Sequence, residues 1–178
     1  MKQLFKLKAV ALFVMAFLVS TIAFGQGKQQ ASPADSASGT AAGSMIKISY
    51  HSPSVKGRKI WGGLVPYDKV WRTGANEATI FTTSKAIKIG GKTLPAGKYS
   101  LYTTPGEKEW KIIFNSQTGQ WGIKMGGETT DDASKDVLVA AATPMKSQAF
   151  NERFKIEVNS KGFVLLWENL AVPVAISK

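Results

Sequence analysis

Short segments in which apolar and polar residues alternate follow one another from residue 45 to the C terminus. Segments 45–50 (MIKISY) and 150–158 (FNERFKIEV) show the two-residue period most clearly, as expected of half-buried strands. Segment 110–115 (WKIIFN) is strongly apolar and also predicts a strand. Further extended segments are predicted at 58–61, 70–72, 78–83, 86–89, 92–94, 98–104, 136–142, 163–168 and 172–176. No segment has the apolar spacing of a three-turn helix.

Glycine and proline residues separate these segments at the spacing typical of all-β domains. The pattern predicts a single antiparallel β-sandwich or jelly roll, with a closed barrel as the second choice. A tight hairpin is expected at Gly90-Gly91, and a long loop carrying Trp121 is expected at 116–134. Pro173 suits the last strand to the edge of a sheet, because proline cannot donate a ladder hydrogen bond.

The N-terminal part of the chain predicts export. Residues 1–25 combine three lysines, a 16-residue apolar run and a small-residue end, which together indicate a cleaved signal peptide and no membrane span in the mature chain. Residues 26–44 (QGKQQASPADSASGTAAGS) carry no aromatic or large aliphatic side chain, so we expect a disordered linker. The folded domain is then expected at 45–178, in a periplasmic or extracellular protein.

Composition restricts the possible chemistry. The absence of cysteine excludes disulfides, thiol catalysis and zinc–thiolate sites. Without the lysines of the expected signal peptide, 20 basic and 12 acidic residues leave a formal charge of +8. Such a charge attracts anionic surfaces, although the lysines are scattered as on an ordinary solvated surface. An exported chain without a nucleic-acid module predicts no nucleic-acid partner.

The common catalytic and metal-binding patterns are missing. His51 is the single histidine, so it is the only candidate base for a Ser-His-Asp triad, and no GxSxG turn is present. Asp131 and Asp132 lack the spacing of a calcium loop, and the Gly-Gly pairs lack a phosphate-loop context. We therefore expect no cofactor and no metal. A carboxylate-dependent hydrolase would have to use Glu77 with a second carboxylate.

The segment from Trp61 to Phe81 (WGGLVPYDKVWRTGANEATIF) concentrates rigid aromatic rings and hydrogen-bonding side chains. A small binding cleft needs these residue types, because flat rings stack on a ligand and an arginine fork holds oxygen atoms. The candidate ligand-binding residues are Trp61, Tyr67, Trp71, Arg72, Asn76 and Glu77, with Lys56 and Arg58 upstream. The alternative is structural: the indoles fill the core, and an Arg-Glu pair ties the loop to the sheet.

Several stretches resemble one known family. SVKGR at 54–58, GGLVPYDKVWRTGANEAT at 62–79, LPAGKYSLYTTPGEKEW at 94–110, IIFN at 112–115 and WG at 121–122 are similar to the bacterial family called domain of unknown function 2911. The resemblance implies an exported single-domain protein and no known activity. His51 stands where that pattern leads us to expect arginine, and Asp68 stands where we expect glycine.

Together these features predict an exported β-sandwich that binds a small polar or glycan-like ligand at the segment from Trp71 to Glu77. A structural or assembly module of the bacterial cell envelope, whose basic surface contacts an envelope protein or an anionic surface, is the alternative. The carboxylate-dependent hydrolase is the third. The expectation favours a protein that is not an enzyme.

Overall fold

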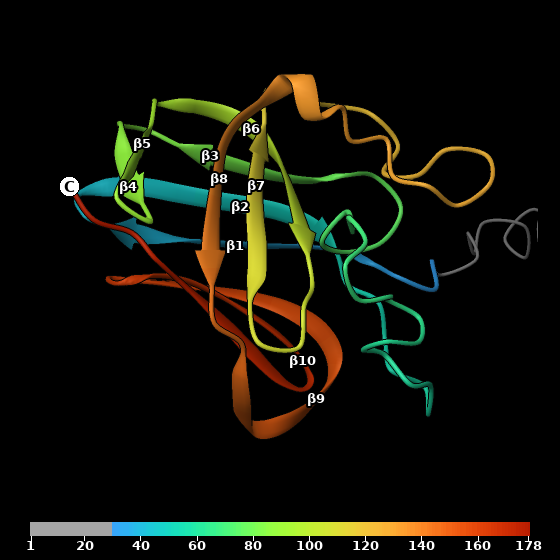
Figure 1. Ribbon diagram of the computed structural model, residues 1–178. Helices are drawn as coiled ribbons and strands as arrows, with labels where there is room; N and C mark the ends of the chain where they lie inside the picture. Colours follow the sequence, from blue (N-terminus) through green and yellow to red (C-terminus); the bar gives the residue numbers. More distant parts are fainter. Residues whose placement is uncertain (1–29) are drawn as a thin grey trace, which may run out of the picture. The chain divides into compact units, whose positions relative to one another are not determined.

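The computed structural model describes residues 30–178 of the 178-residue chain, and its main element is a six-stranded antiparallel sheet (Figure 1). The strands lie in the order β1-β2-β3-β6-β7-β8, so the chain adds neighbours largely in sequence. Their bounds are β1 Ala34–Ala41, β2 Ser44–His51, β3 Thr79–Thr83, β6 Gly97–Thr104, β7 Trp110–Asn115 and β8 Asp136–Ala142. Between β3 and β6 along the chain lies the β4–β5 hairpin (Ile87–Ile89, Lys92–Leu94). It turns at the predicted Gly90-Gly91.

A long curved hairpin forms the second layer. Strands β9 (Met145–Asn159) and β10 (Gly162–Ala175) form a two-stranded sheet with each other and curl below the large sheet in Figure 1. The segments predicted at 163–168 and 172–176 are one continuous strand, with irregular register around Glu168. Pro173 lies in this strand, and the edge of the strand that faces away from β9 has no hydrogen-bonded neighbour strand. Such an edge suits proline, because proline has no N–H to donate. The prediction of an all-β, sandwich-like fold is confirmed.

The core lies between the large sheet and the hairpin. Alternate residues of β2 are buried, as the two-residue period predicted, and they join apolar residues of β7 and of both hairpin strands. Phe81 and Phe114 meet edge to face on neighbouring parts of the sheet, and Phe163 of the hairpin covers Phe81. The largest fully buried side chains are Trp110, Trp167, Tyr102, Phe81, Phe114, Phe154 and Phe163. Burial of aromatic surface therefore holds the two layers together without disulfides.

The expectation that 26–44 is disordered is wrong for residues 34–41. These residues form β1, which pairs antiparallel with β2 from Ala34 opposite His51 to Ala41 opposite Ser44. The strand has few apolar side chains to bury, so its composition gives it little stability. It is ordered because its backbone forms hydrogen bonds with β2. Small side chains also let β1 lie close to the hairpin, where Gly39 faces Val158. Residues 1–25, including the expected signal peptide, lie outside the described residues.

The segment 58–61 also departs from expectation. It forms no strand; Trp61 makes a single bridge to Val65, and the Ile60–Val65 turn is closed by backbone hydrogen bonds. Residues 70–72 contribute only the bridge between Trp71 and Thr103. Both segments leave the sheet and cross one end of the sandwich as loops. In the described part of the chain, no helix is long and apolar enough to cross a bilayer.

The close approach of β1 to β9 gives a stability test. A Cβ atom on Gly39 would lie 3.0 Å from Val158 Cγ1, so Gly39→Val should overpack this contact and destabilise the fold by about 1–3 kcal/mol. Ser38→Val on the exposed face of the same strand is the control and should change the free energy of unfolding little. Urea unfolding measures both, and equal stability of the two variants would show that β1 is not packed in solution.

The predicted long loop ends in a carboxylate cluster around Asn115. The amide nitrogen of Asn115 donates to Asp131 Oδ1 at 3.3 Å and to Asp136 Oδ1 at 2.8 Å. Burial, together with the charges of Asp136 and Asp132, raises the pKa of Asp131 to about 6. Asp132 instead accepts hydrogen bonds from the Ser134 hydroxyl and backbone N–H, which lower its pKa. Among the described residues, no group of His, Cys, Asp and Glu side chains is arranged to hold a metal ion.

The raised pKa of Asp131 predicts a pH-dependent stability. Because the folded protein binds this proton more tightly than the unfolded chain, stability falls as the pH rises from about 4 to about 6. Asp131→Asn removes the charge and should stabilise the protein at pH 7.5 by about 1 kcal/mol, allowing for solvent screening of a partly exposed group. The gain should vanish at pH 4, and urea unfolding at both pH values measures it. A gain that is equal at the two pH values would contradict this assignment.

Candidate functional site

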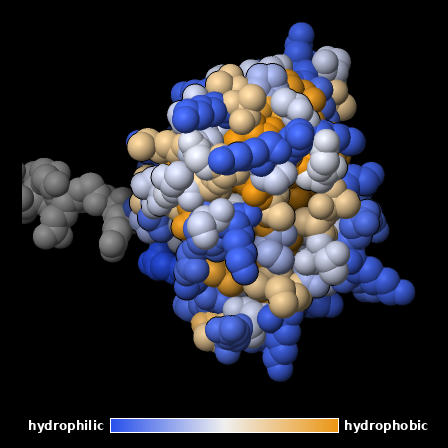
Figure 2. Space-filling model, turned by 90° about the vertical axis from the view of Figure 1, so that its left-hand side faces the viewer, coloured by the Kyte–Doolittle hydropathy of each residue, from blue (hydrophilic) through white to orange (hydrophobic). Residues whose placement is uncertain are grey.

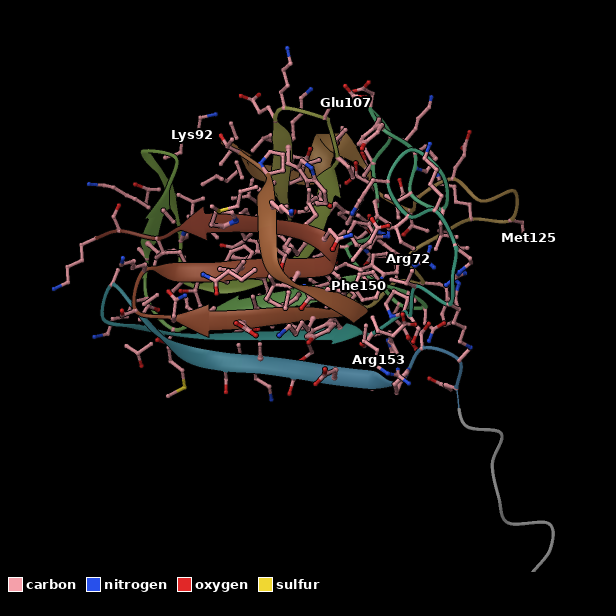
Figure 3. The ribbon with its side chains drawn as sticks, turned by 90° about the horizontal axis from the view of Figure 1, so that it is seen from below. Arg72, Lys92, Glu107, Met125, Phe150 and Arg153 are labelled. Carbon is pink, nitrogen blue, oxygen red and sulfur yellow. The ribbon has the colours of Figure 1, made fainter. Side chains whose placement is uncertain are left out.

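A cleft of about 290 Å³ opens at the end of the sandwich where the loops after β2 gather. Figure 3 shows Arg72 among these loops, at the opposite end of the domain from Lys92. Five regions of the chain line the cleft: the segment before β1, the loops 53–58, 64–65 and 71–75, and β10. The lining residues are Ala31, Ser32, Pro53, Ser54, Lys56, Arg58, Leu64, Val65, Trp71, Arg72, Gly74, Ala75 and Trp167.

Arg72 is the most unusual side chain of this lining. Burial lowers the pKa of its guanidinium below the ordinary value of arginine. Its Nε–H is buried without a hydrogen-bond partner, and it forms no ion pair with any carboxylate of residues 30–178. A partly buried charge without a partner costs free energy, so this arrangement is unfavourable for the domain by itself.

Gly122 sets the position of the Arg72 side chain. A Cβ atom at residue 122 would lie only 2.1 Å from Arg72 Cδ, so the arginine stem occupies the space that any larger residue would need. The backbone around Gly122 is tied to the site, because its N–H donates to Asn76 O and Thr130 N–H donates to Gly122 O. The long loop therefore forms a wall for Arg72 even though it does not line the cleft.

The loop from Trp71 to Asn76 is held in a strained conformation. Thr73 is fully buried with φ = 55°, a value that β-branched residues rarely adopt. Its hydroxyl lies within hydrogen-bonding distance of both Trp71 O and Thr103 Oγ1, and its single proton can be donated to either; its carbonyl accepts from Thr79 Oγ1 at 2.7 Å. Trp71 exchanges two backbone hydrogen bonds with Thr103. These bonds fix the loop against β3 and β6 and so fix the direction in which Arg72 leaves the backbone.

Backbone strain gathers around the cleft. Six residues other than glycine have positive φ among the described residues; Lys56 lines the cleft, and Thr73 and Asn76 lie within or next to the 71–75 loop without lining it. Each such residue costs of order 1–3 kcal/mol and persists only where the surroundings enforce it. This concentration of strained residues marks the cleft as a place where geometry is fixed at the expense of stability.

Lys56 and Arg58 add two more cationic side chains to the lining. The loop that carries them is anchored by its backbone, since Val55 N–H donates to Glu152 O and Lys56 N–H donates to Glu152 Oε1. The Arg58 guanidinium donates to Val55 O and Ser54 O. Its remaining N–H groups are not used by these two carbonyls. The lining contains three cationic side chains and no carboxylate, so its electrostatic potential favours an anion.

Four of the eight predicted site residues line the cleft: Lys56, Arg58, Trp71 and Arg72. The other four have different positions. Trp61 belongs to the aromatic cluster, where its ring lies 5.9 Å from that of Trp71 and 5.8 Å from that of Trp167. Tyr67 packs beside Gly62. The sequence prediction therefore combined residues that line the cleft with residues that pack elsewhere.

Asn76 and Glu77 brace the loop. Asn76 donates its amide hydrogen to Ser32 O at 3.3 Å, which ties the loop to the segment before β1. Glu77 lies 3.1 Å from His51 Nδ1, and Arg72 is not its partner. The expected Arg-Glu tie is thus replaced by a His-Glu contact. Since the cleft is lined by no carboxylate, it offers no carboxylate pair for the hydrolase alternative.

The structure also places the two residues that we expected to differ from the family pattern. Asp68, where we expected glycine, has φ = 58°, a conformation in which glycine carries no steric cost. His51, where we expected arginine, faces Glu77, so an arginine there would keep an opposite charge at the same carboxylate. Both expectations match the local geometry without placing either residue in the cleft lining.

Sequence reasoning missed Trp167, Gly122 and the segment at Ala31-Ser32. Trp167 stacks on Trp71 at 5.8 Å with an interplanar angle of 16°, and its Nε1–H is buried without a partner. It lies about a hundred residues from the predicted segment, so no local pattern connects the two. Gly122 carried a signal, because a tryptophan-glycine pair inside a polar loop is unusual. Ala31 and Ser32 fell in the expected linker.

Comparison with known proteins identifies a family and no individual relative. The model of the family described as protein of unknown function (DUF2911) matches residues 32–176, which include the cleft lining except Ala31. The match begins just before β1, in agreement with the ordered start of the domain. No curated protein and no solved structure matches the chain.

The hydrogen bond from Thr79 to Thr73 gives a test of how the loop is held. Thr79→Val removes the donor and leaves the carbonyl of Thr73 without this bond, so unfolding should become easier by about 1–3 kcal/mol. Thr82→Val on the same strand is the control, because Thr82 is only partly buried and makes no comparable contact. Thermal and urea unfolding compare the variants; a Thr79→Val protein as stable as the control would show that other contacts hold the loop.

Proposed function

Because the chain belongs to the DUF2911 family, which has no known activity, its role must be inferred from its own site, and we propose that it binds a small polar ligand in this cleft. The observation that carries the proposal is the buried, unpartnered Nε–H of Arg72 in the wall of an open cleft. Buried donors are almost always satisfied in proteins, so an arginine without a partner in a cleft wall favours a ligand that supplies the acceptor.

The size and lining of the cleft agree with a single small molecule. Ligand pockets occupy roughly 300–1,000 Å³ and combine apolar walls with a few polar groups, and this cleft lies at the lower end of that range. Trp71, Trp167 and Leu64 supply apolar surface, while Arg72 supplies the hydrogen-bonding fork. A sugar-sized or single-ring solute fits both requirements, in keeping with the polar or glycan-like ligand expected from the sequence.

The lining provides binding groups and no evident catalytic set. Among the described residues that form the cleft there is no carboxylate, no histidine and no cysteine, and the hydroxyls of Ser32 and Ser54 have no neighbouring base in the lining. We therefore favour a binding protein that presents or captures a solute after export. If no solute binds, the structural or assembly module of the cell envelope becomes the preferred function.

Intrinsic fluorescence offers a direct test. Trp71 and Trp167 line the cleft, so a bound solute should change their emission, and Trp121→Phe removes an exposed indole outside the cleft to lower the background. Titration of the purified Trp121→Phe protein with a library of small sugars and organic acids should give saturable changes. The absence of any saturable change across the library would overturn the proposal.

A matched pair of variants locates the response. Leu64→Ala removes an exposed aliphatic side chain from the cleft and should weaken binding about fivefold, as expected for roughly 1 kcal/mol of lost apolar contact. Met125→Ala removes an apolar side chain that is exposed on the long loop and does not line the cleft, and it should leave binding unchanged. Equal effects of the two substitutions would place the ligand elsewhere.

A further inference from the structure

The cleft selects for charge as well as for size, and we infer that its ligand is a small organic acid whose carboxylate binds Arg72 while its apolar body lies against Trp71 and Leu64. This inference rests on the proposed function and narrows it to one chemical class. It is carried by three observations: the distribution of charge in the lining, the unsatisfied donors and the shape of the arginine fork.

The charge distribution is one-sided. Lys56, Arg58 and Arg72 all line the cleft, and no Asp or Glu among the described residues does. Glu77, five residues after Arg72, is engaged with His51 instead. The basic residues elsewhere are scattered along the chain. Figure 2 shows that hydrophilic side chains are spread across the end of the domain that carries β4 and β5. Although the Glu152 carboxylate lies beside the Lys56 backbone, three cations and no carboxylate line the cleft, and a bound anion would balance this charge.

Two side chains of the lining hold buried donors without acceptors. Arg72 Nε–H and Trp167 Nε1–H both lack a hydrogen-bond partner among the described residues. The burial that lowers the pKa of Arg72 also makes its guanidinium poorly solvated. A carboxylate offers several lone pairs and a full negative charge, so it satisfies the arginine donors and offsets the desolvation of the guanidinium in one contact.

The fork of Arg72 is held in place before the ligand arrives. Its stem is packed on Gly122, and its backbone lies between Trp71 and the strained Thr73, both fixed by hydrogen bonds to Thr103. A guanidinium with a fixed orientation matches the planar, two-oxygen geometry of a carboxylate. Preorganisation of this kind lowers the entropy that binding would otherwise cost.

The apolar part of the lining distinguishes an organic acid from an inorganic ion. Pro53, Leu64, Val65, Ala75 and the two indoles make up much of the cleft wall. An inorganic phosphate would leave this surface wet, whereas the ring or chain of an organic acid would cover it. A uronic acid and an aromatic acid both meet the requirement, since each joins a carboxylate to a flat or ring-shaped body.

Matched acid and neutral probes test the inference. Isothermal titration of the purified protein with galacturonate against galactose, and with benzoate against benzamide, compares molecules of similar shape that differ in charge. At least one acid should bind ten times more tightly than its neutral twin, and added salt should weaken the acid alone. Inorganic phosphate is the third probe, and tight binding of phosphate without binding of either acid would overturn the organic-acid assignment.

Variants of Arg72 assign the preference to its fork. Arg72→Met keeps the stem on Gly122 and should abolish the tenfold preference, and Arg72→Lys should retain only part of it because the fork is lost. Arg153→Met is the charge-matched control, because Arg153 is exposed and does not line the cleft; it should keep the full preference. Thermal unfolding confirms that each variant is folded, and a preference that survives Arg72→Met in a folded protein overturns the inference.

The outcomes separate this inference from the proposed function. Equal binding of acids and neutral twins, weakened by Leu64→Ala, would overturn the charge selection and leave the cleft as a binding site. No binding of any probe or library member would overturn both. Preferential acid binding that depends on Arg72 supports both.

Discussion

Two indoles from distant parts of the chain connect the site to the core. Trp71 from the loop and Trp167 from β10 stack at 5.8 Å, and Trp61, Trp110 and Phe154 meet them edge to face. This cluster joins the large sheet, the curved hairpin and the loop in one packed unit, because each element contributes at least one ring. The loop that carries Arg72 therefore belongs to the core at Trp71 and to the cleft wall at Arg72.

That arrangement explains how a strained loop can persist. The left-handed conformation of Thr73 and the unpartnered guanidinium of Arg72 both cost free energy, and the buried aromatic cluster offsets them. Natural proteins tolerate such local costs mainly where a site requires them. The same reasoning separates the two roles that the sequence left mixed: the Trp61 ring serves packing, Asn76 and Glu77 brace the loop, and Arg72 serves the cleft.

Much of the fold could be predicted from local pattern. The two-residue alternation in 45–50 marked β2 because one face of that strand is buried, and in 150–158 it marked β9, where Phe154 and Ile156 are buried and Phe150 is exposed. Order at 34–41 could not be predicted in this way, because β1 is stabilised by backbone pairing with β2 and close packing on Val158. Composition reports what a segment can bury and says little about which backbone it can pair with.

The sequence by itself determined that the domain is all-β, that it needs no disulfides, and that the segment around Trp71 and Arg72 carries the candidate site. Only the tertiary structure decided which of those side chains line a cleft, because that depends on contacts between residues far apart in the chain. Gly122 positions the arginine stem, Trp167 completes the wall, and His51 takes Glu77 away from Arg72. Each of these contacts arises from the way distant strands and loops meet, and no local spacing encodes it.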